Sequence, residues 1–287
     1  MSLPENFNFS IGNVSGAILN FAQMGAFFLL PLFLQVVLGY SAIKTGKVLL
    51  PLAVAIMIIA PIAGKLSDRL GAKFMVIPGM ILISGGLFYL GHFSDTTTPV
   101  QLIIPFIILG VGMGLALSPL TNITLLDIPS EETGGASGVF STTRQLGSIM
   151  GIALLGLVLQ TQLTTNITAN IAKIDGLPPQ IQMVIVEMAD SGNMMGGNIE
   201  EQLKKELTDL AISGELQLGA ASKDGSQTAK PQKIGQEIGS AFKLSFVQSI
   251  NLTFKISSII TLLGALTAVF FKNNRYSKSG AVKLAKQ

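Results

Sequence analysis

The sequence predicts an all-α membrane protein with six transmembrane helices. Of its 287 residues, 49% are hydrophobic and only 12% are charged, and the mean hydropathy is +0.58. Such a chain is too apolar and too poor in charge for an ordinary soluble domain. The apolar residues also form long runs, and most cations lie between or after these runs. Together these observations indicate a multi-pass membrane protein surrounded by a lipid bilayer.

Six apolar runs are long enough to cross a bilayer. The hydrocarbon core is about 30 Å thick and an α-helix rises about 1.5 Å per residue, so roughly 20 apolar residues suffice. Prolines and glycines within the runs are compatible with this, since both are common in membrane helices. The predicted spans are residues 14–37, 48–63 with its flanks, 74–93, 100–123, 139–159 and 250–271.

A short charged island, residues 64–73, separates the second run from the third. We expect a tight turn here, because the runs on both sides carry no charge. Gly64 and Gly71 would let the two helix ends approach closely. Asp68 would accept backbone N–H bonds or face the positive end of the following helix.

The cations in the short loops predict the orientation of the bundle. Eight lie on one side: Lys65, Arg69, Lys73, Lys272, Arg275, Lys278, Lys283 and Lys286. Only two, Lys44 and Lys47, lie on the other side. Residues 160–249 are left out of the comparison, because long loops translocate largely regardless of charge. We therefore expect a plasma or inner membrane protein with both termini in the cytoplasm, inserted by its first span without a cleavable signal peptide.

The polar segment 160–249 differs from the rest of the chain and predicts an extracytoplasmic insertion. Apolar residues recur at helical spacing within residues 181–188, 199–210 and 234–242, which predicts short amphipathic helices. The domain plan is then helices 1–5 in residues 1–159, the insertion in 160–249, helix 6 in 250–271 and a basic cytoplasmic tail in 272–287.

The residue types exclude most catalytic chemistry. The chain has no cysteine and a single histidine, His92, so disulfides, thiolate sites and histidine-based metal clusters are excluded. No Ser/His/Asp or Cys/His set and no phosphate-binding loop can be assembled. We predict no enzymatic activity, no catalytic residues, no cofactor and no metal. The net charge of +3 does not indicate a nucleic-acid partner, because the cations lie at helix ends and in the tail.

The pattern Gly64-x-x-x-Asp68-Arg69-x-Gly71-x-Lys73 resembles the signature loop of the major facilitator superfamily. The residues around it, 31–41 and 45–51, are similar to helices of the fourteen-helix drug:proton antiporters. The glycine-rich segments 110–114 and 134–147 are similar as well. The resemblance covers about residues 14–271 without the insertion. It implies one six-helix half with an inverted three-plus-three repeat, in which the signature residues take part in gating.

The same resemblance implies which half this is. In that subfamily the antiporter glycine motif and the main proton-carrying acids belong to the N-terminal half. No Asp or Glu lies inside any of the six predicted spans here. We therefore expect the C-terminal half of a transporter, working with an N-terminal half from the same gene or from a separate chain.

Polar and aromatic residues recur at helical spacing within two of the spans. They are Asn20, Gln23 and Phe27 in the first span, and Ser118 and Asn122 in the fourth. A polar group in lipid costs free energy unless it faces protein or water. Helix–helix packing is the alternative interpretation for each residue, and the small-residue pairs 110/114 and 147/151 favour it. The resemblance implies that the first and fourth helices line the cavity, which makes these five residues candidates for substrate contact.

Arg144 is a cation well inside the fifth run. At a helix centre it would cost roughly 2.5 to 3.5 kcal/mol on insertion scales. We expect it to extend to the cytoplasmic surface or to pair with Asp127, Glu131 or Glu132. A structural tether and a gating role both remain open.

These expectations define the predicted function. The chain is interpreted as half of a proton-coupled multidrug efflux transporter, acting by alternating access on an amphipathic small molecule. The alternatives are a non-transporting or truncated membrane scaffold, and a half transporter for a lipid or another solute. Pairing of two copies of this chain is a further alternative.

Overall fold

Every regular element in the described part of the chain is a helix. A computed structural model describes residues 6–174, 177, 179–190 and 229–271. The helices are α1 (Phe7–Leu32), the π-helical turn η2 (Phe33–Val37), α2 (Ala42–Leu70), α3 (Lys73–Leu90), α4 (Pro99–Leu125), α5 (Thr133–Ile171), α6 (Pro179–Asp190) and α8 (Ala229–Val269). Six of the described helices are long and apolar enough to cross a membrane, which agrees with the six predicted spans.

Local hydrogen bonds define where several helices begin and end. The Ser41 side chain caps α2 by accepting the Lys44 backbone N–H at 3.3 Å. Thr98 and Gln101 form a reciprocal capping box at the start of α4. The π-helical turn η2 directly follows α1, and the Leu38 N–H donates to the Phe33 carbonyl oxygen at 3.3 Å, five residues earlier.

The turn between α2 and α3 is shorter than the sequence predicts. Helix α2 continues to Leu70, so residues 64–70 are helical and only Gly71 and Ala72 connect the two helices. Gly71 has φ 99°, a conformation that favours glycine, and its N–H donates to the Ser67 carbonyl at 2.9 Å. The predicted turn over residues 64–73 is therefore wrong for most of its length. Charge ends the transmembrane run but not the helix, because Lys, Leu and Arg are good helix formers.

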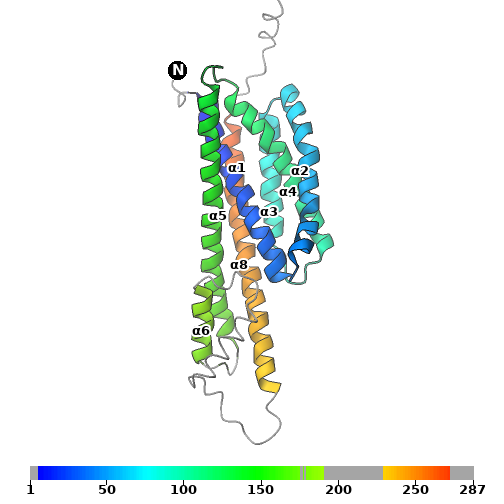
Figure 1. Cartoon of the computed structure of the whole chain (residues 1–287), viewed down its shortest axis with the longest axis vertical. Coiled ribbons are helices and arrows are strands. Elements are labelled where there is room, and N and C mark those ends of the chain that lie inside the picture. The colour runs from blue at the N-terminus through cyan, green and yellow to red at the C-terminus, as the bar shows by residue number, and fades with distance from the viewer. Residues whose placement is uncertain (1–5, 175–176, 178, 191–228, 272–287) are drawn as a thin grey trace, which may run out of the picture.

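Helices α5 and α8 are also longer than predicted. Helix α5 continues past residue 159 to Ile171, and α8 begins at Ala229 rather than near residue 250. With 39 residues, α5 is about 58 Å long, well beyond the hydrocarbon thickness. Both helices run past the ends of α2, α3 and α4, on the side away from the N-terminus (Figure 1).

The part of α5 and α8 that extends beyond the other helices is stable as helix because the two helices bury side chains against each other. Leu163 and Ile167 on α5 are buried, as are Phe242 and Phe246 on α8. The amphipathic helix predicted in residues 181–188 is present as α6, and the one in 234–242 is the start of α8. The stretch 199–210 lies outside the described residues.

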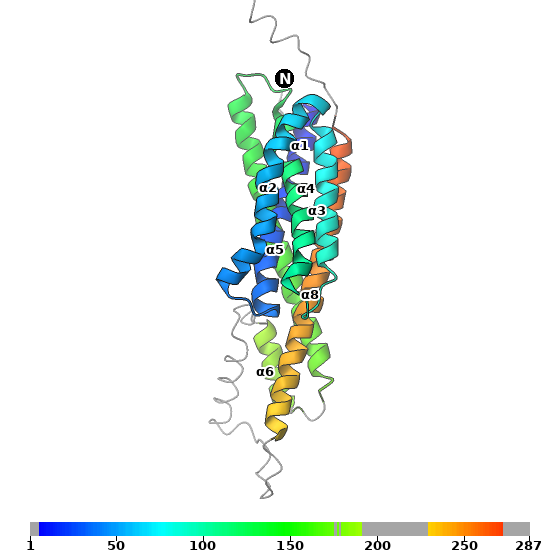
Figure 2. The same ribbon diagram turned by 90° about the vertical axis from the view of Figure 1, so that its right-hand side faces the viewer.

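The helices form two layers. Helices α2, α4, α1 and α5 lie in this order in one layer, since α4 packs against α2 and α1 packs against both α4 and α5. Helices α3 and α8 form the second layer: α3 packs behind α4, and α8 packs behind α1 and α5. Figure 2 shows α2 and α5 toward one side of the molecule and α3 and α8 toward the other. The core between the layers contains Leu29, Leu30, Phe33, Met80, Ile83, Leu87 and Phe106, all fully buried.

Glycines bring neighbouring helices of the first layer into close contact. A Cβ on Gly147 of α5 would lie 2.2 Å from the Ala17 carbonyl oxygen of α1. A Cβ on Gly110 of α4 would lie 2.5 Å from the Leu52 carbonyl oxygen of α2. No side chain fits in such a gap, so only glycine permits this backbone approach. The small-residue pairs 110/114 and 147/151 therefore act in packing, as the sequence predicts.

Candidate functional site

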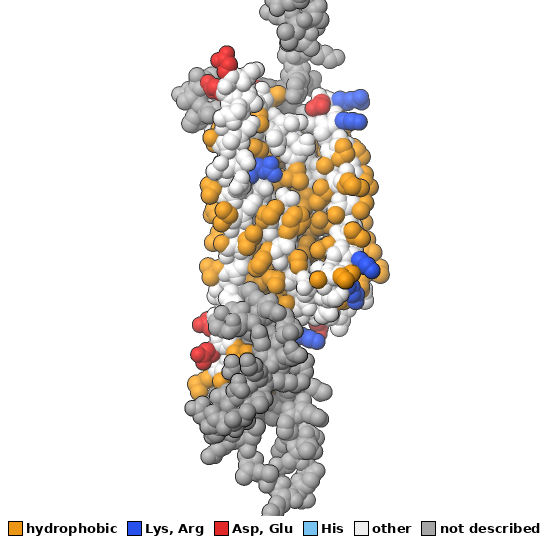
Figure 3. Space-filling view, viewed as in Figure 1, with side chains coloured by type: hydrophobic (Ala, Val, Ile, Leu, Met, Phe, Trp, Pro, Cys, Tyr) orange, Lys and Arg blue, Asp and Glu red, His pale blue; other side chains and the backbone are white. Residues whose placement is uncertain are grey.

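The outer face of the α2–α4–α1–α5 layer is an apolar surface that no other described helix covers. In the most apolar windows of α2 and α5, only 17% and 28% of residues are buried, against 50–56% for α1, α3 and α4. Figure 3 looks onto this face, where a broad apolar band lies between charged groups near its two ends. A single basic group lies inside the band (Figure 3). The two edge helices thus expose much more apolar surface than the others.

Arg144 of α5 reaches across the seam between α5 and α1. Its Nη2 atom donates to the Asn20 side-chain oxygen at 3.5 Å, and the guanidinium carbon lies 5.6 Å from the centre of the Phe140 ring. Gly16 of α1 leaves room for the Phe140 ring, since a Cβ there would lie 2.6 Å from Phe140 Cε2. The side chain is half-buried. It follows the usual direction of helical side chains, toward the N-terminus of its own helix.

Asn20 holds its amide in place with a second bond. Its Nδ2 atom donates to the Gly16 carbonyl oxygen at 2.9 Å, which leaves the side-chain oxygen free to accept from Arg144. Asn20 itself is only 6% exposed. The structure therefore places the Asn20 side-chain oxygen at hydrogen-bonding distance from the Arg144 guanidinium.

The acidic loop after α4 does not pair with Arg144 in the described residues. Asp127 instead accepts from Asn8 Nδ2 at 2.7 Å, and its carbonyl oxygen accepts from Asn6 at 3.2 Å. The expected ion pair between Arg144 and this loop is therefore replaced by a contact with α1. The reason is geometric. The close α1–α5 seam puts Asn20 within reach of Arg144, whereas Asp127 is bonded to Asn6 and Asn8 at the start of α1.

The other candidate cavity residues lie on the same layer and differ in how much of each side chain is exposed. Phe27 is 40% exposed and Gln23 is half-buried on α1. On α4, Asn122 is exposed, while Ser118 is half-buried. The Ser118 hydroxyl lies 3.5 Å from where a Cβ on Gly64 would be, so it faces α2.

The signature residues occupy the end of α2 and the start of α3. Asp68 and Arg69 are exposed on the last turn of α2, and Gly64 lies one helical turn earlier against α4. Lys73 projects from the start of α3 to the end of α8, where it donates to the Phe271 carbonyl oxygen at 3.1 Å. Its ammonium group also donates to the Val269 carbonyl oxygen. Gly71 provides the positive φ that connects the two helices.

A ladder of buried hydroxyls along α8 is a feature that the sequence analysis missed. Five fully buried residues repeat every four positions: Ser245, Ser249, Thr253, Ser257 and Thr261. Ser249 accepts from Asn166 Nδ2 of α5, and Ser245 accepts from Asn170, each at 2.9 Å. The four-residue repeat of Ser and Thr was the available signal. Ser245 and Ser249 thus tie α8 to α5, as interhelical polar bonds do in membranes, whereas Thr253 and Thr261 donate to carbonyl oxygens of α8 itself.

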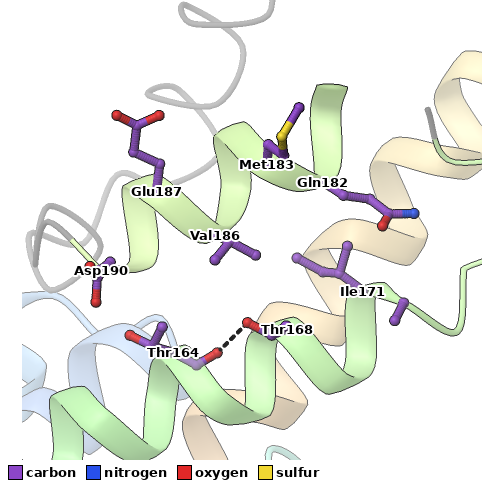
Figure 4. Close-up of a pocket in the computed structure, with 9 residues that line it drawn as sticks. Thr164, Thr168, Ile171, Gln182, Met183, Val186, Glu187 and Asp190 are labelled. Atoms are coloured by element: carbon purple, nitrogen blue, oxygen red, sulfur yellow. Dashed lines mark hydrogen bonds between the residues drawn. The ribbon is translucent and has the colours of Figure 1, made fainter. Parts of the chain in front are cut away.

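A groove of about 700 Å³ lies between α5 and α6. Val186 and Ile171 point into the gap between the two helices, whereas Glu187 and Met183 point away from it (Figure 4). The Thr168 hydroxyl at its floor already donates to the Thr164 carbonyl oxygen at 2.8 Å. The groove thus combines apolar surface from Ile171 and Val186 with the carboxylates of Glu187 and Asp190 at its edge. Among the described residues, no cluster of three or more acidic or histidine side chains is arranged to hold a metal ion.

Comparison with known proteins identifies the family. Residues 8–152, half of the chain, match the family model described as Major Facilitator Superfamily. The chain belongs to this superfamily. Its members are transporters and not enzymes, which agrees with the absence of catalytic sets in the sequence. The two-layer bundle of six candidate membrane spans fits one half of such a transporter.

Several curated relatives are named as drug transporters. The chain is 32% identical over 173 residues to the multidrug resistance protein Stp of Mycobacterium tuberculosis, covering 60% of this chain and 32% of that protein. It is 26% identical over 282 residues to the multidrug transporter protein MdtP of Bacillus subtilis, covering 98% of this chain and 49% of that protein. It is 40% identical over 138 residues to the uncharacterized transporter YebQ of Escherichia coli, covering 48% of this chain and 30% of that protein. The chain thus spans half or less of the length of these relatives.

Proposed function

We propose that this chain is the C-terminal six-helix half of a proton-coupled multidrug exporter of the major facilitator superfamily. The observation that carries the proposal is the layer α2–α4–α1–α5, with its exposed outer face and with α1 and α4 at its centre. A second six-helix half laid against that face would enclose a cavity between the central helices, and rocking of the halves would alternate access to it. The relatives named as multidrug transporters support the substrate class.

The proposal gives the candidate residues distinct roles. Phe27, Gln23 and Asn122 would contact an amphipathic substrate with aromatic and amide groups. Asn20 would act through Arg144, and Ser118 would act at the α2–α4 contact. The signature residues Gly64, Asp68, Arg69, Gly71 and Lys73 would form the cytoplasmic gate.

The proposed orientation has both termini and the α2–α3 turn in the cytoplasm. The chain contains no cysteine, so single cysteines report position without background. In intact cells, an Asp68→Cys variant should resist a membrane-impermeant maleimide, whereas an Asp95→Cys variant in the α3–α4 loop should react. Labelling of the cysteine at position 68 from outside, with protection at 95, would reverse the assignment.

The transport proposal is tested by coexpression with an N-terminal half. The partner is the part of MdtP that precedes its region of similarity to this chain. The control is that part of MdtP expressed alone. Coexpression should lower accumulation of a fluorescent drug in cells that lack other exporters, and a protonophore should abolish the difference. Failure of every such pairing, while intact MdtP exports the same drug, would favour the scaffold interpretation.

A further inference from the structure

Arg144 carries far more hydrogen-bonding capacity than its neighbours use. A guanidinium has five N–H donors in a planar fork. Within the described residues, its contacts are one hydrogen bond of 3.5 Å to Asn20 and the face of the Phe140 ring. A distance of 3.5 Å is long for a charge-assisted bond, which is usually 2.7–2.9 Å. Most of the donors of Arg144 are therefore available to another group.

The surroundings of Arg144 select for an anionic oxygen ligand. None of the six apolar runs contains Asp or Glu, and no carboxylate of the described residues pairs with Arg144. Arg144 lies eleven residues into α5, roughly 16 Å from its start at 1.5 Å per residue. In a medium of low dielectric constant, a cation with unused donors strongly favours a carboxylate, which a guanidinium binds in bidentate geometry.

Neighbouring groups limit the orientations of the guanidinium. Gly16 leaves room for the Phe140 ring, which lies beneath the cation. Asn20 is fixed by its own bond to the Gly16 carbonyl. Preorganisation of this kind lowers the entropic cost of binding a ligand. Phe27 is exposed on α1 seven residues beyond Asn20, roughly 10 Å along the helix axis at 1.5 Å per residue.

We propose that Arg144, positioned by Asn20, binds the carboxylate of an amphipathic organic anion in the transport cavity. The inference deepens the proposed function and rests on it, since it takes the outer face of the layer as the cavity wall. It assigns this half a preference for anionic over cationic amphipaths, because the only formal charge inside the apolar runs of α1, α2, α4 and α5 is positive.

Two xanthene dyes test the charge preference on a common scaffold. Fluorescein carries a free carboxylate, and rhodamine 6G is a cation whose carboxylate is esterified. Binding is measured by fluorescence anisotropy to the full chain in nanodiscs of zwitterionic lipid, without a partner half. We expect the wild-type chain to bind fluorescein and Arg144→Gln to weaken this binding about tenfold or more. Arg144→Lys should give an intermediate loss, because an ammonium lacks the planar fork.

The matched control is Lys243→Gln, which removes an exposed cation from the extended part of α8. This variant should leave fluorescein binding within about twofold of the wild type, and Arg144→Gln should leave rhodamine 6G binding unchanged or tighter. Thermal unfolding of each variant shows whether it is folded, and Arg144→Lys keeps the test valid if the Gln variant is not. The assignment is overturned if the wild type does not bind fluorescein. It is also overturned if Arg144→Gln weakens the binding of both dyes equally, or if Arg144→Gln and Lys243→Gln weaken fluorescein binding equally.

The carboxylate source is tested separately. If Arg144 instead pairs with an acidic side chain of the adjoining half, Arg144→Glu will abolish export by paired halves and an Asp/Glu→Lys change in that half will restore it. Such rescue overturns the solute assignment. The chain could also bind fluorescein through Arg144 and yet support no export in coexpression. That result would support this binding site and would count only against the proposed transport function.

Discussion

The Lys73 ammonium group donates a hydrogen bond to the Phe271 carbonyl oxygen at 3.1 Å, which joins the start of α3 to the end of α8. The last carbonyls of a helix have no intrahelical donor and carry partial negative charge. A lysine from a neighbouring helix donates a hydrogen bond to these carbonyls and also balances their partial negative charge. The lysine of the signature pattern is thus also a tether between the two helices of the second layer.

Replacing Lys73 with Ala should destabilise the bundle by about 1 kcal/mol, because the α8 carbonyls lose their charged donor. Thermal unfolding in detergent measures the change. Lys65→Ala is the matched control, since Lys65 is exposed on the last part of α2 and has no described partner. An equal loss of stability in both variants would show that net charge, and not the tether, is responsible.

Gly147→Ala should cost about 1–3 kcal/mol, because the new Cβ would lie 2.2 Å from the Ala17 carbonyl oxygen and would force α1 and α5 apart. Gly138→Ala on the same helix meets no atom within 4 Å. That variant should be neutral or stabilising by up to about 1 kcal/mol through helix propensity. Unfolding in detergent compares the two, and similar midpoints would contradict the close seam.

Ser84 and Ser258 form a reciprocal pair between α3 and α8. Each hydroxyl donates to the other residue's backbone carbonyl, at 2.9 and 2.8 Å. Single Ser→Ala changes should each cost about 0.6 kcal/mol and at most about 1.7. The double mutant should show nearly additive losses, because each bond to a backbone carbonyl survives the partner's change and only the contact between the two hydroxyls, 3.0 Å apart, would add a coupling. No loss of stability in either single variant would contradict the pairing.

Asn170 and Ser245 join α5 to α8 in the extension beyond the bundle, with Nδ2 and Oγ 2.9 Å apart. The cysteine-free background allows a crosslinking test. Asn170→Cys with Ser245→Cys should form a disulfide on mild oxidation, detected as a linked peptide by mass spectrometry. Ala169→Cys with Ser245→Cys should not, because Ala169 is exposed on another side of α5. Crosslinking of both pairs alike would contradict the register of the two helices.

Much of the architecture followed from local sequence properties. The six spans were predictable because transfer of apolar residues into lipid and the need for internal backbone bonds act on each run separately. The glycine pairs 110/114 and 147/151 were predictable for a similar reason, since close helix packing requires small side chains at fixed spacing. The ends of the helices were not, as the extension of α2 to Leu70 and of α5 to Ile171 shows. Hydropathy indicates where an apolar span ends, but the backbone hydrogen bonds of the helix can continue past that point.

The sequence by itself predicted six membrane-spanning helices, which the described residues contain as candidate spans, and it marked Arg144 as an unusual charge within a span. Only the tertiary structure decided that Arg144 meets Asn20, that Lys73 meets Phe271, and that five hydroxyls of α8 are buried. The physical reason is that partition into lipid depends on composition along the chain, whereas these contacts depend on which helices become neighbours and at what rotation.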